Sequence, residues 1–191
     1  MKTKQYLEDL GHGNPSEAFE AAKSLSNLPR LSVKRIIEVL NDTRDISNRA
    51  AIVYVLSWLH RKKNAEVLQA LIHIAGDARE NPAVRGQALE GLGVQRSTPR
   101  HKLWHKIERV VLDSLRHKEV EVRFWACYAA GSLRMRGALP QLQELAGNDS
   151  AMYPTWWRIS EEATDAIEWI FGRSTEVRMR ANTPEERKSE A

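Results

Sequence analysis

A repeat with a period near 36 residues constrains this chain more than any other feature. Four similar stretches each contain an arginine, and the spacings are 36, 38 and 35 residues: Arg49, Arg85, Arg123 and Arg158. The stretches are rich in helix-forming residues, and an amphipathic segment follows each of the first three. A unit of this length buries its apolar side only by stacking on its neighbours. The repeat therefore predicts an all-α fold, an α-solenoid of about four to five helical hairpins.

Each unit is expected to contain an arginine helix, a turn and a following helix. The arginine helices are predicted at 46–60, 82–94, 119–134 and 155–171, and the following helices at 64–76, 101–117 and 137–147. An incomplete first unit, which lacks the arginine, fits 15–28 and 31–41. Proline after asparagine, as in Asn14-Pro15 and Asn81-Pro82, is typical of helix starts.

The pattern divides the chain into three parts. Residues 1–14 form an N-terminal segment, residues 15–172 form the repeat domain, and residues 173–191 form a charged tail. The tail has almost no apolar periodicity and mixes basic with acidic residues, so we expect it to be flexible.

Composition narrows the cellular setting. The 42% hydrophobic and 28% charged content is ordinary for a globular protein, and no apolar run approaches the ~20 residues of a membrane span. The N-terminus lacks the apolar core of a signal peptide. The single cysteine, Cys127, excludes an internal disulfide, and its apolar surroundings predict a buried, inert thiol. We therefore expect a cytoplasmic protein with no membrane contact.

Two segments resemble a known repeat family. In 119–150 and 82–93, the matching residues are Glu121, Val122, Arg123, Ala126, Ala129, Ala130, Gly131, Ala138, Leu139, Pro140, Leu142 and Leu145, and Val84, Arg85, Ala88, Leu89, Leu92 and Gly93. The pattern resembles bacterial HEAT-like repeats of the phycobilin-lyase type. The resemblance implies a stack whose following helices line the concave side. Proteins of this class act as scaffolds, lyase subunits, inhibitors or nucleic-acid binders.

The four arginines are interpreted as structural. An arginine in the first turn of a helix opposes the helix dipole and needs a compensating acid. Acidic residues precede the arginines, such as Glu80 before Arg85 and Asp149 before Arg158. We expect a ladder of arginine–carboxylate contacts between repeats, because the guanidinium group suits bidentate pairing. The alternative is a row of phosphate-binding arginines.

The predicted helix 101–117 carries the strongest concentration of charge. We call its cations the basic ridge: Lys102, His105, Lys106, Arg109 and Arg116. Arg96 and Arg100 lie just upstream, and Arg61-Lys62-Lys63 could extend the patch. The ridge is either a solvated helix face or a docking site for an acidic protein surface or a phosphate backbone.

A second candidate surface lies where the regular pattern ends. The segment 152–157 contains Trp156 and Trp157, and tryptophan is enriched at interface hot spots. The alternative is a hydrophobic cap that closes the core of the last repeat, because terminal repeats must shield it.

The sequence shows no motif for catalysis, a cofactor or a metal. His101 and His105 have helical spacing but lack a third ligand, and P-loop, dinucleotide and nucleophile-elbow motifs are absent. One enzymatic interpretation remains, since HEAT-like DNA glycosylases use tryptophan, aspartate and arginine. Trp156, Trp157, Arg158 and Asp165 are the right types, but their spacing puts them on one helix rather than several.

These observations predict a non-catalytic protein–protein interaction module of a bacterial cytoplasm: an adaptor, inhibitor or immunity-type scaffold. It would bind an acidic protein surface through its concave face, with the basic ridge as the main contact. The alternative is a nucleic-acid-binding protein, in the extreme a relative of the DNA glycosylases. A net charge of +4 is compatible with both.

Overall fold

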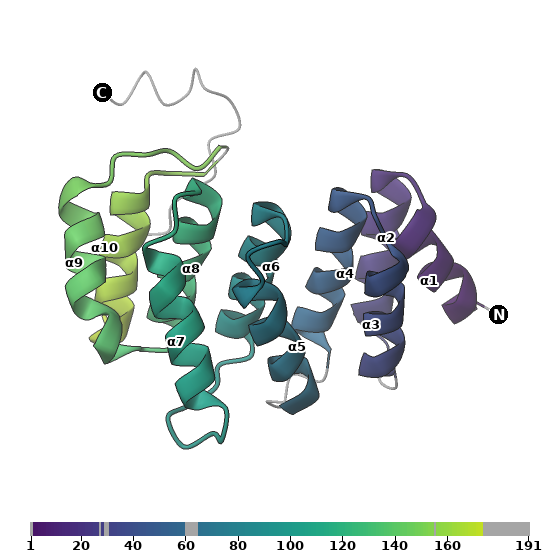
Figure 1. Cartoon of the computed structure of the whole chain (residues 1–191), viewed down its shortest axis with the longest axis horizontal. Coiled ribbons are helices and arrows are strands. Elements are labelled where there is room, and N and C mark those ends of the chain that lie inside the picture. The colour runs from purple at the N-terminus through teal and green to yellow at the C-terminus, as the bar shows by residue number, and fades with distance from the viewer. Residues whose placement is uncertain (1, 27, 29–30, 60–64, 155, 174–191) are drawn as a thin grey trace.

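The computed structural model describes residues 2–26, 28, 31–59, 65–154 and 156–173. Within these residues the chain forms ten α-helices and one short 3-10 helix, η1 (Figure 1). The bounds are α1 Lys2–His12, α2 Pro15–Ser26, α3 Val33–Asp42, α4 Ile46–Trp58, α5 Ala65–Gly76, α6 Pro82–Val94, α7 Trp104–Leu115, α8 Val120–Ser132, η1 Arg136–Ala138, α9 Leu139–Asn148 and α10 Ile159–Ile170. The predicted all-α repeat fold is confirmed.

The helices form two layers along the stack. The arginine layer consists of α2, α4, α6, α8 and α10, each packed on the next, and the second layer consists of α3, α5, α7 and α9. A continuous core of buried aliphatic and alanine side chains lies between the layers. The sequence analysis assigned no structure to residues 1–14, yet α1 packs on α2, α3 and α4 and buries Leu10. It therefore closes the N-terminal end of the core.

The hairpins begin one helix earlier than the arginine pattern suggested. Among helices that are consecutive in the chain, each second-layer helix packs more extensively on the helix that follows it than on the one that precedes it. The resulting pairs are α3 with α4, α5 with α6, α7 with α8 and α9 with α10, and α1 pairs with α2 in the same way. Each hairpin is thus a second-layer helix followed by an arginine helix. The arginine pattern shows where helices begin. It does not show whether an arginine helix packs on the helix before it or on the helix after it.

Side-chain caps fix several helix starts. Asn14 Oδ1 accepts hydrogen bonds from the backbone N–H groups of Ser16 (3.0 Å) and Glu17 (3.1 Å), while Glu17 Oε2 accepts from Asn14 N–H (2.9 Å). Asn81 caps α6 by accepting from Ala83 N–H (2.9 Å), with Pro82 at the first helical position. These caps satisfy N–H groups that have no partner within the helix.

Small residues bring the helices of the arginine layer close together. A Cβ atom added at Gly131 of α8 would lie 2.7 Å from Cα of Ala166 in α10, and one added at Gly91 of α6 would lie 3.0 Å from Cβ of Ser57 in α4. The helices of the second layer pack less closely on each other. Closer spacing in one layer bends a two-layered stack toward that layer. The arginine layer is therefore the inner one, which corrects the expectation that the following helices line the concave side.

Candidate functional site

Arg49 links three elements of the stack. Its Nε and Nη2 atoms donate to the Glu80 carboxylate, with 3.3 Å between Nε and Oε1. Its Nη1 donates to the backbone carbonyls of Leu40 (2.7 Å) and Thr43 (2.8 Å), where α3 ends. The guanidinium thus caps the preceding helix and binds an acid of the following unit.

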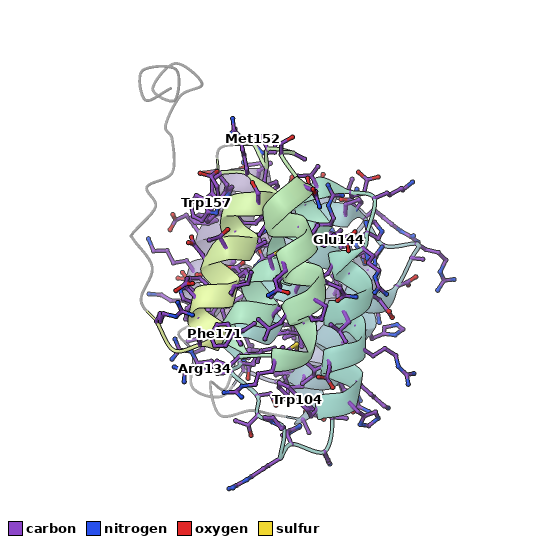
Figure 2. The ribbon with its side chains drawn as sticks, turned by 90° about the vertical axis from the view of Figure 1, so that its left-hand side faces the viewer. Trp104, Arg134, Glu144, Met152, Trp157 and Phe171 are labelled. Atoms are coloured by element: carbon purple, nitrogen blue, oxygen red, sulfur yellow. The ribbon has the colours of Figure 1, made fainter. Side chains whose placement is uncertain are left out.

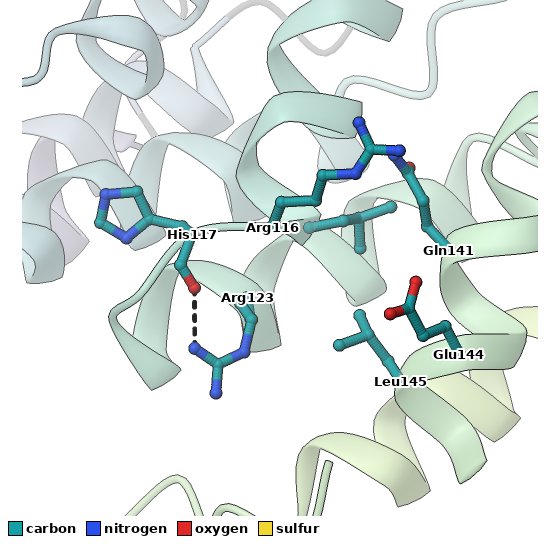
Figure 3. Close-up of a pocket in the computed structure, with 7 residues that line it drawn as sticks. Arg116, His117, Arg123, Gln141, Glu144 and Leu145 are labelled. Carbon is teal, nitrogen blue, oxygen red and sulfur yellow. Dashed lines mark hydrogen bonds between the residues drawn. The ribbon is translucent and has the colours of Figure 1, made fainter. Parts of the chain in front are cut away.

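Arg123 repeats this arrangement two units later. Nε donates to Asp149 Oδ2 (2.7 Å), and Nη1 donates to the carbonyls of His117 (2.7 Å) and Lys118 (2.8 Å) after α7. Figure 3 shows the bond to the His117 carbonyl. In both cases the acid lies shortly before the next arginine in the sequence but pairs with the previous one: Glu80 precedes Arg85 and binds Arg49, and Asp149 precedes Arg158 and binds Arg123. This geometry is a ladder between units, and it occupies the donor atoms that a phosphate would need.

Between these two rungs, an imidazole replaces the carboxylate. Arg85 Nε donates to the Ala75 carbonyl (3.0 Å), and Nη1 lies 2.9 Å from Nε2 of His117. Burial and the neighbouring Arg85 charge lower the pKa of His117, and burial lowers the pKa of Arg85. The neutral imidazole has one acceptor nitrogen, so it can accept either from Arg85 Nη1 at Nε2 or from the Glu119 N–H at Nδ1 (3.1 Å). The protonated ring would place two cations in contact.

Arg158 does not form the ladder contact predicted for it. The other three arginines occupy the fourth position of their helices, but α10 starts at Ile159, so Arg158 is its N-cap and its side chain is exposed. The fourth position of α10 is Glu162, whose buried carboxylate accepts from Trp157 Nε1 (2.7 Å). The sequence spacing was misleading because the longer loop before α10 shifts the helix start.

The basic ridge is exposed along α7 and the residues that flank it. Lys102, His105, Lys106, Arg109 and Arg116 are all exposed. None of the ion pairs among the described residues involves them, in contrast to Arg49 and Arg123. Because α7 belongs to the second layer, the ridge lies on the outer side of the stack rather than on the concave side.

A shallow hollow lies at the C-terminal end of the ridge. It measures about 340 Å³ and is lined by Leu115, Arg116, His117, Arg123, Gln141, Glu144 and Leu145 (Figure 3). The Gln141 amide, with its oxygen turned toward Arg116, accepts from Nε (3.0 Å) and Nη2 (2.8 Å). The amide holds Arg116 in place and leaves its positive charge uncompensated.

The predicted aromatic patch is half-buried and packs on α8. The ring of Phe124 lies 5.6 Å from that of Trp156, 5.7 Å from that of Trp157 and 4.9 Å from that of Tyr153, measured between centroids. The Tyr153 hydroxyl donates to Glu121 Oε1 (2.6 Å), and burial followed by this hydrogen bond raises the pKa of Tyr153. The cluster has the geometry of a cap, and the exposed Met152 lies at its rim (Figure 2).

The residues weighed for chemistry are dispersed. Asp165 is buried in α10, Arg158 is exposed, and the indole N–H of Trp157 is bound to Glu162. In the described part of the chain, no group of three or more His, Cys, Asp and Glu side chains could hold a metal ion. Cys127 is fully buried, which raises the pKa of its thiol. No helix within the described ranges is both long and apolar enough to span a membrane.

Sequence reasoning missed two strained arginines. Arg96 and Arg134 have φ values of 44° and 52°, and they are the only non-glycine residues with positive φ among those described. Both follow the C-cap of an arginine-layer helix, the position that Gly172 occupies after α10. This conformation could not be predicted from the sequence, because the left-handed residue after a helix is usually glycine and arginine is not expected there.

Two predicted features lie outside the described residues. The cations Arg61, Lys62 and Lys63 belong to the range 60–64, and the predicted charged tail includes 174–191. Both therefore stay predictions.

Comparisons with known proteins agree with the fold. Residues 77–167 match the family model described as HEAT repeats. A chain in the complex of CpcE and CpcF of phycocyanin lyase from Nostoc sp. PCC7120 superimposes with a TM-score of 0.69 at 19% identity, covering 86% of this chain and 97% of that one. A designed armadillo repeat protein in complex with the peptide (KR)4 gives 0.49 at 18% identity, covering 86% and 80%. No curated protein matches this chain.

Proposed function

Because residues 77–167 match the HEAT-repeat model, we propose that this chain is a non-catalytic protein-interaction module that binds an acidic surface of its partner. It would act as an adaptor, an inhibitor or an immunity-type scaffold in a bacterial cytoplasm. The rigid stack holds the binding residues in a fixed arrangement, so little conformational entropy is lost when the partner docks.

The uncompensated basic ridge carries this proposal. Arg49, Arg85 and Arg123 are held by carbonyls and by a carboxylate or an imidazole. Lys102, Lys106 and Arg109 are exposed and take part in none of the ion pairs among the described residues, although they lie in a chain with 25 acidic residues. A row of unpaired cations on a rigid helix attracts an acidic partner and orients it.

Two further observations support a protein partner. The CpcE–CpcF structure, which shares this fold over 86% of the chain, is a complex of two proteins. Met152, which is 43% exposed, lies beside half-buried Trp156 and Trp157 at the end of the stack. An apolar rim of this kind suits a secondary protein contact rather than a polyanion.

The test is a comparison of partner capture by matched variants. Lysate proteins retained by the wild-type chain are identified by mass spectrometry, with and without nuclease, and compared with those retained by K106E/R109E. The control, K34E/R44E, makes the same charge change at exposed residues distant from α7. We expect a partner with an acidic surface that resists nuclease, is retained by the control and is lost from K106E/R109E. Equal retention by both variants would refute the role of the ridge.

A further inference from the structure

Beyond this protein-binding face, we propose that one end of the stack binds the phosphate backbone of duplex nucleic acid. The residues concerned follow the C-termini of α6 and α8, and we call them the arginine edge: Arg96, Arg100, Arg134 and Arg136. None of them belongs to the basic ridge, so the proposal stands or falls independently of the proposed function.

The first observation is that the fold keeps arginine where glycine fits better. Arg96 and Arg134 both adopt the left-handed conformation, at equivalent places after two successive arginine-layer helices. A side chain with a Cβ is strained there, whereas glycine adopts the same φ without strain, as Gly172 does after α10. Strain retained at two equivalent positions indicates that the guanidinium groups serve a purpose other than folding.

The second observation is that the two strained sites lie side by side. The Ser132 hydroxyl at the end of α8 donates to the Gly93 carbonyl at the end of α6 (2.9 Å). This bond ties together the two helix ends from which Arg96 and Arg134 follow. Helices packed in this way lie about 8–10 Å apart, so the backbones that carry Arg96 and Arg134 are close neighbours. Figure 2 shows Arg134 at the same end of the molecule as Trp104, away from Met152.

The third observation concerns charge. All four arginines are exposed, and none of the ion pairs in the described ranges involves them. The loops 95–103 and 133–138 contain no acidic residue. The two loops thus carry only positive charge of their own, and Glu108 of α7, whose carboxylate lies against Gly137, is the acidic group beside them.

The chemistry of the edge favours duplex phosphates over other anions. Leu103, Leu133 and Met135 of these loops are buried, so the two loops themselves expose none of the apolar anchors of a protein interface. Phe171, after α10, is the exposed apolar residue at this end (Figure 2). The two loops contain no phenylalanine, tyrosine or tryptophan on which the bases of a single strand could stack. Guanidinium groups suit a chain of phosphates, because arginine binds each phosphate through paired hydrogen bonds.

A purely structural role is the competing explanation, because cations near helix C-termini offset the helix dipole. The two roles differ in what glycine does at positions 96 and 134. If the arginines serve only the helix ends, R96G and R134G leave nucleic-acid binding unchanged. If they bind phosphate, each variant gains stability from relieved strain and loses affinity.

The experiment measures the anisotropy of a fluorescein-labelled 20-base-pair DNA duplex with the full chain between 50 and 200 mM salt. We expect salt-dependent binding by the wild type, about tenfold weaker binding by R96G/R134G, and a slope of log K against log salt that is smaller by about two. The melting temperature of R96G/R134G should rise by about 2–4 °C per substitution.

The control variant is R44G/R158G, which removes the same charge from exposed residues in the loops at the opposite end. It should bind the duplex as the wild type does. The proposal is overturned if the wild type fails to bind at 50 mM salt, if both double variants lose affinity equally, or if R96G/R134G binds normally. A fall in the melting temperature of R96G/R134G would also overturn it, because the arginines would then stabilise the fold.

Discussion

Removal of the Arg123 side chain would show how strongly the ladder holds successive units together. Arg123 and Asp149 are only 14% and 15% exposed, and their Nε–Oδ2 distance is 2.7 Å. Loss of one partner from a fully buried pair costs about 3–5 kcal/mol. Here some solvent reaches both groups and can hydrate the freed carboxylate, which lowers the cost. The carbonyls of His117 and Lys118 also lose a charged donor, which adds to it.

We therefore expect Arg123→Ala to lower the free energy of unfolding by about 3 kcal/mol. For a chain of this size, that corresponds to a fall of about 6–12 °C in melting temperature. Calorimetry and urea unfolding monitored by circular dichroism would measure it. Arg109→Ala, at an exposed position of the basic ridge, is the control and should change stability by less than about 0.5 kcal/mol.

A double-mutant cycle with Asp149→Ala would isolate the pair itself. If the ladder contact is the source of the stability, the effects of R123A and D149A are not additive, and the coupling is about 1–3 kcal/mol. A fall in melting temperature of less than about 2 °C for R123A, or strictly additive effects, would refute the reasoning.

Three further predictions follow from the same contacts. The pKa of His117 is lowered in the folded chain, whereas in the unfolded chain it has the ordinary histidine value of about 6.5. As the pH falls through that value, the unfolded state therefore binds more protons than the folded state. Stability should be complete above that pH and decline as pH falls below it, and urea titrations at pH 7.5 and 5.5 should show a smaller decline for His117→Gln. Tyr153→Phe removes the 2.6 Å bond to Glu121 and should cost about 1 kcal/mol, measured by urea unfolding; no change would mean that water replaces the hydroxyl fully. Cys127 should react with a thiol reagent only under denaturing conditions, since burial raises the pKa of the thiol; rapid labelling of the native chain would contradict its buried position.

Local patterns in the sequence were enough to identify the helices. The range 82–94 agrees with α6, because Asn81 and Pro82 define its start and the apolar spacing defines its buried face. The arginine period predicted stacked units for the same reason, since each unit repeats its own local signals. The helix α1 was missed because it precedes the first repeat and carries no such motif.

Contacts between side chains far apart in the sequence could not be predicted from these local patterns. Glu80 lies 31 residues from Arg49, and it was the stacking of units that directed its carboxylate to that arginine instead of to Arg85. The same packing placed an imidazole at the Arg85 rung and Glu162 at the arginine position of α10.

The sequence by itself determined the helices, their order and the repeat, because these depend on residues close together in the chain. Only the tertiary structure decided which layer is the inner one and which arginines are held internally. It also decided which arginines are exposed in a strained conformation at the end of the stack. These properties depend on how closely neighbouring helices approach, and that distance is set by side chains from different units.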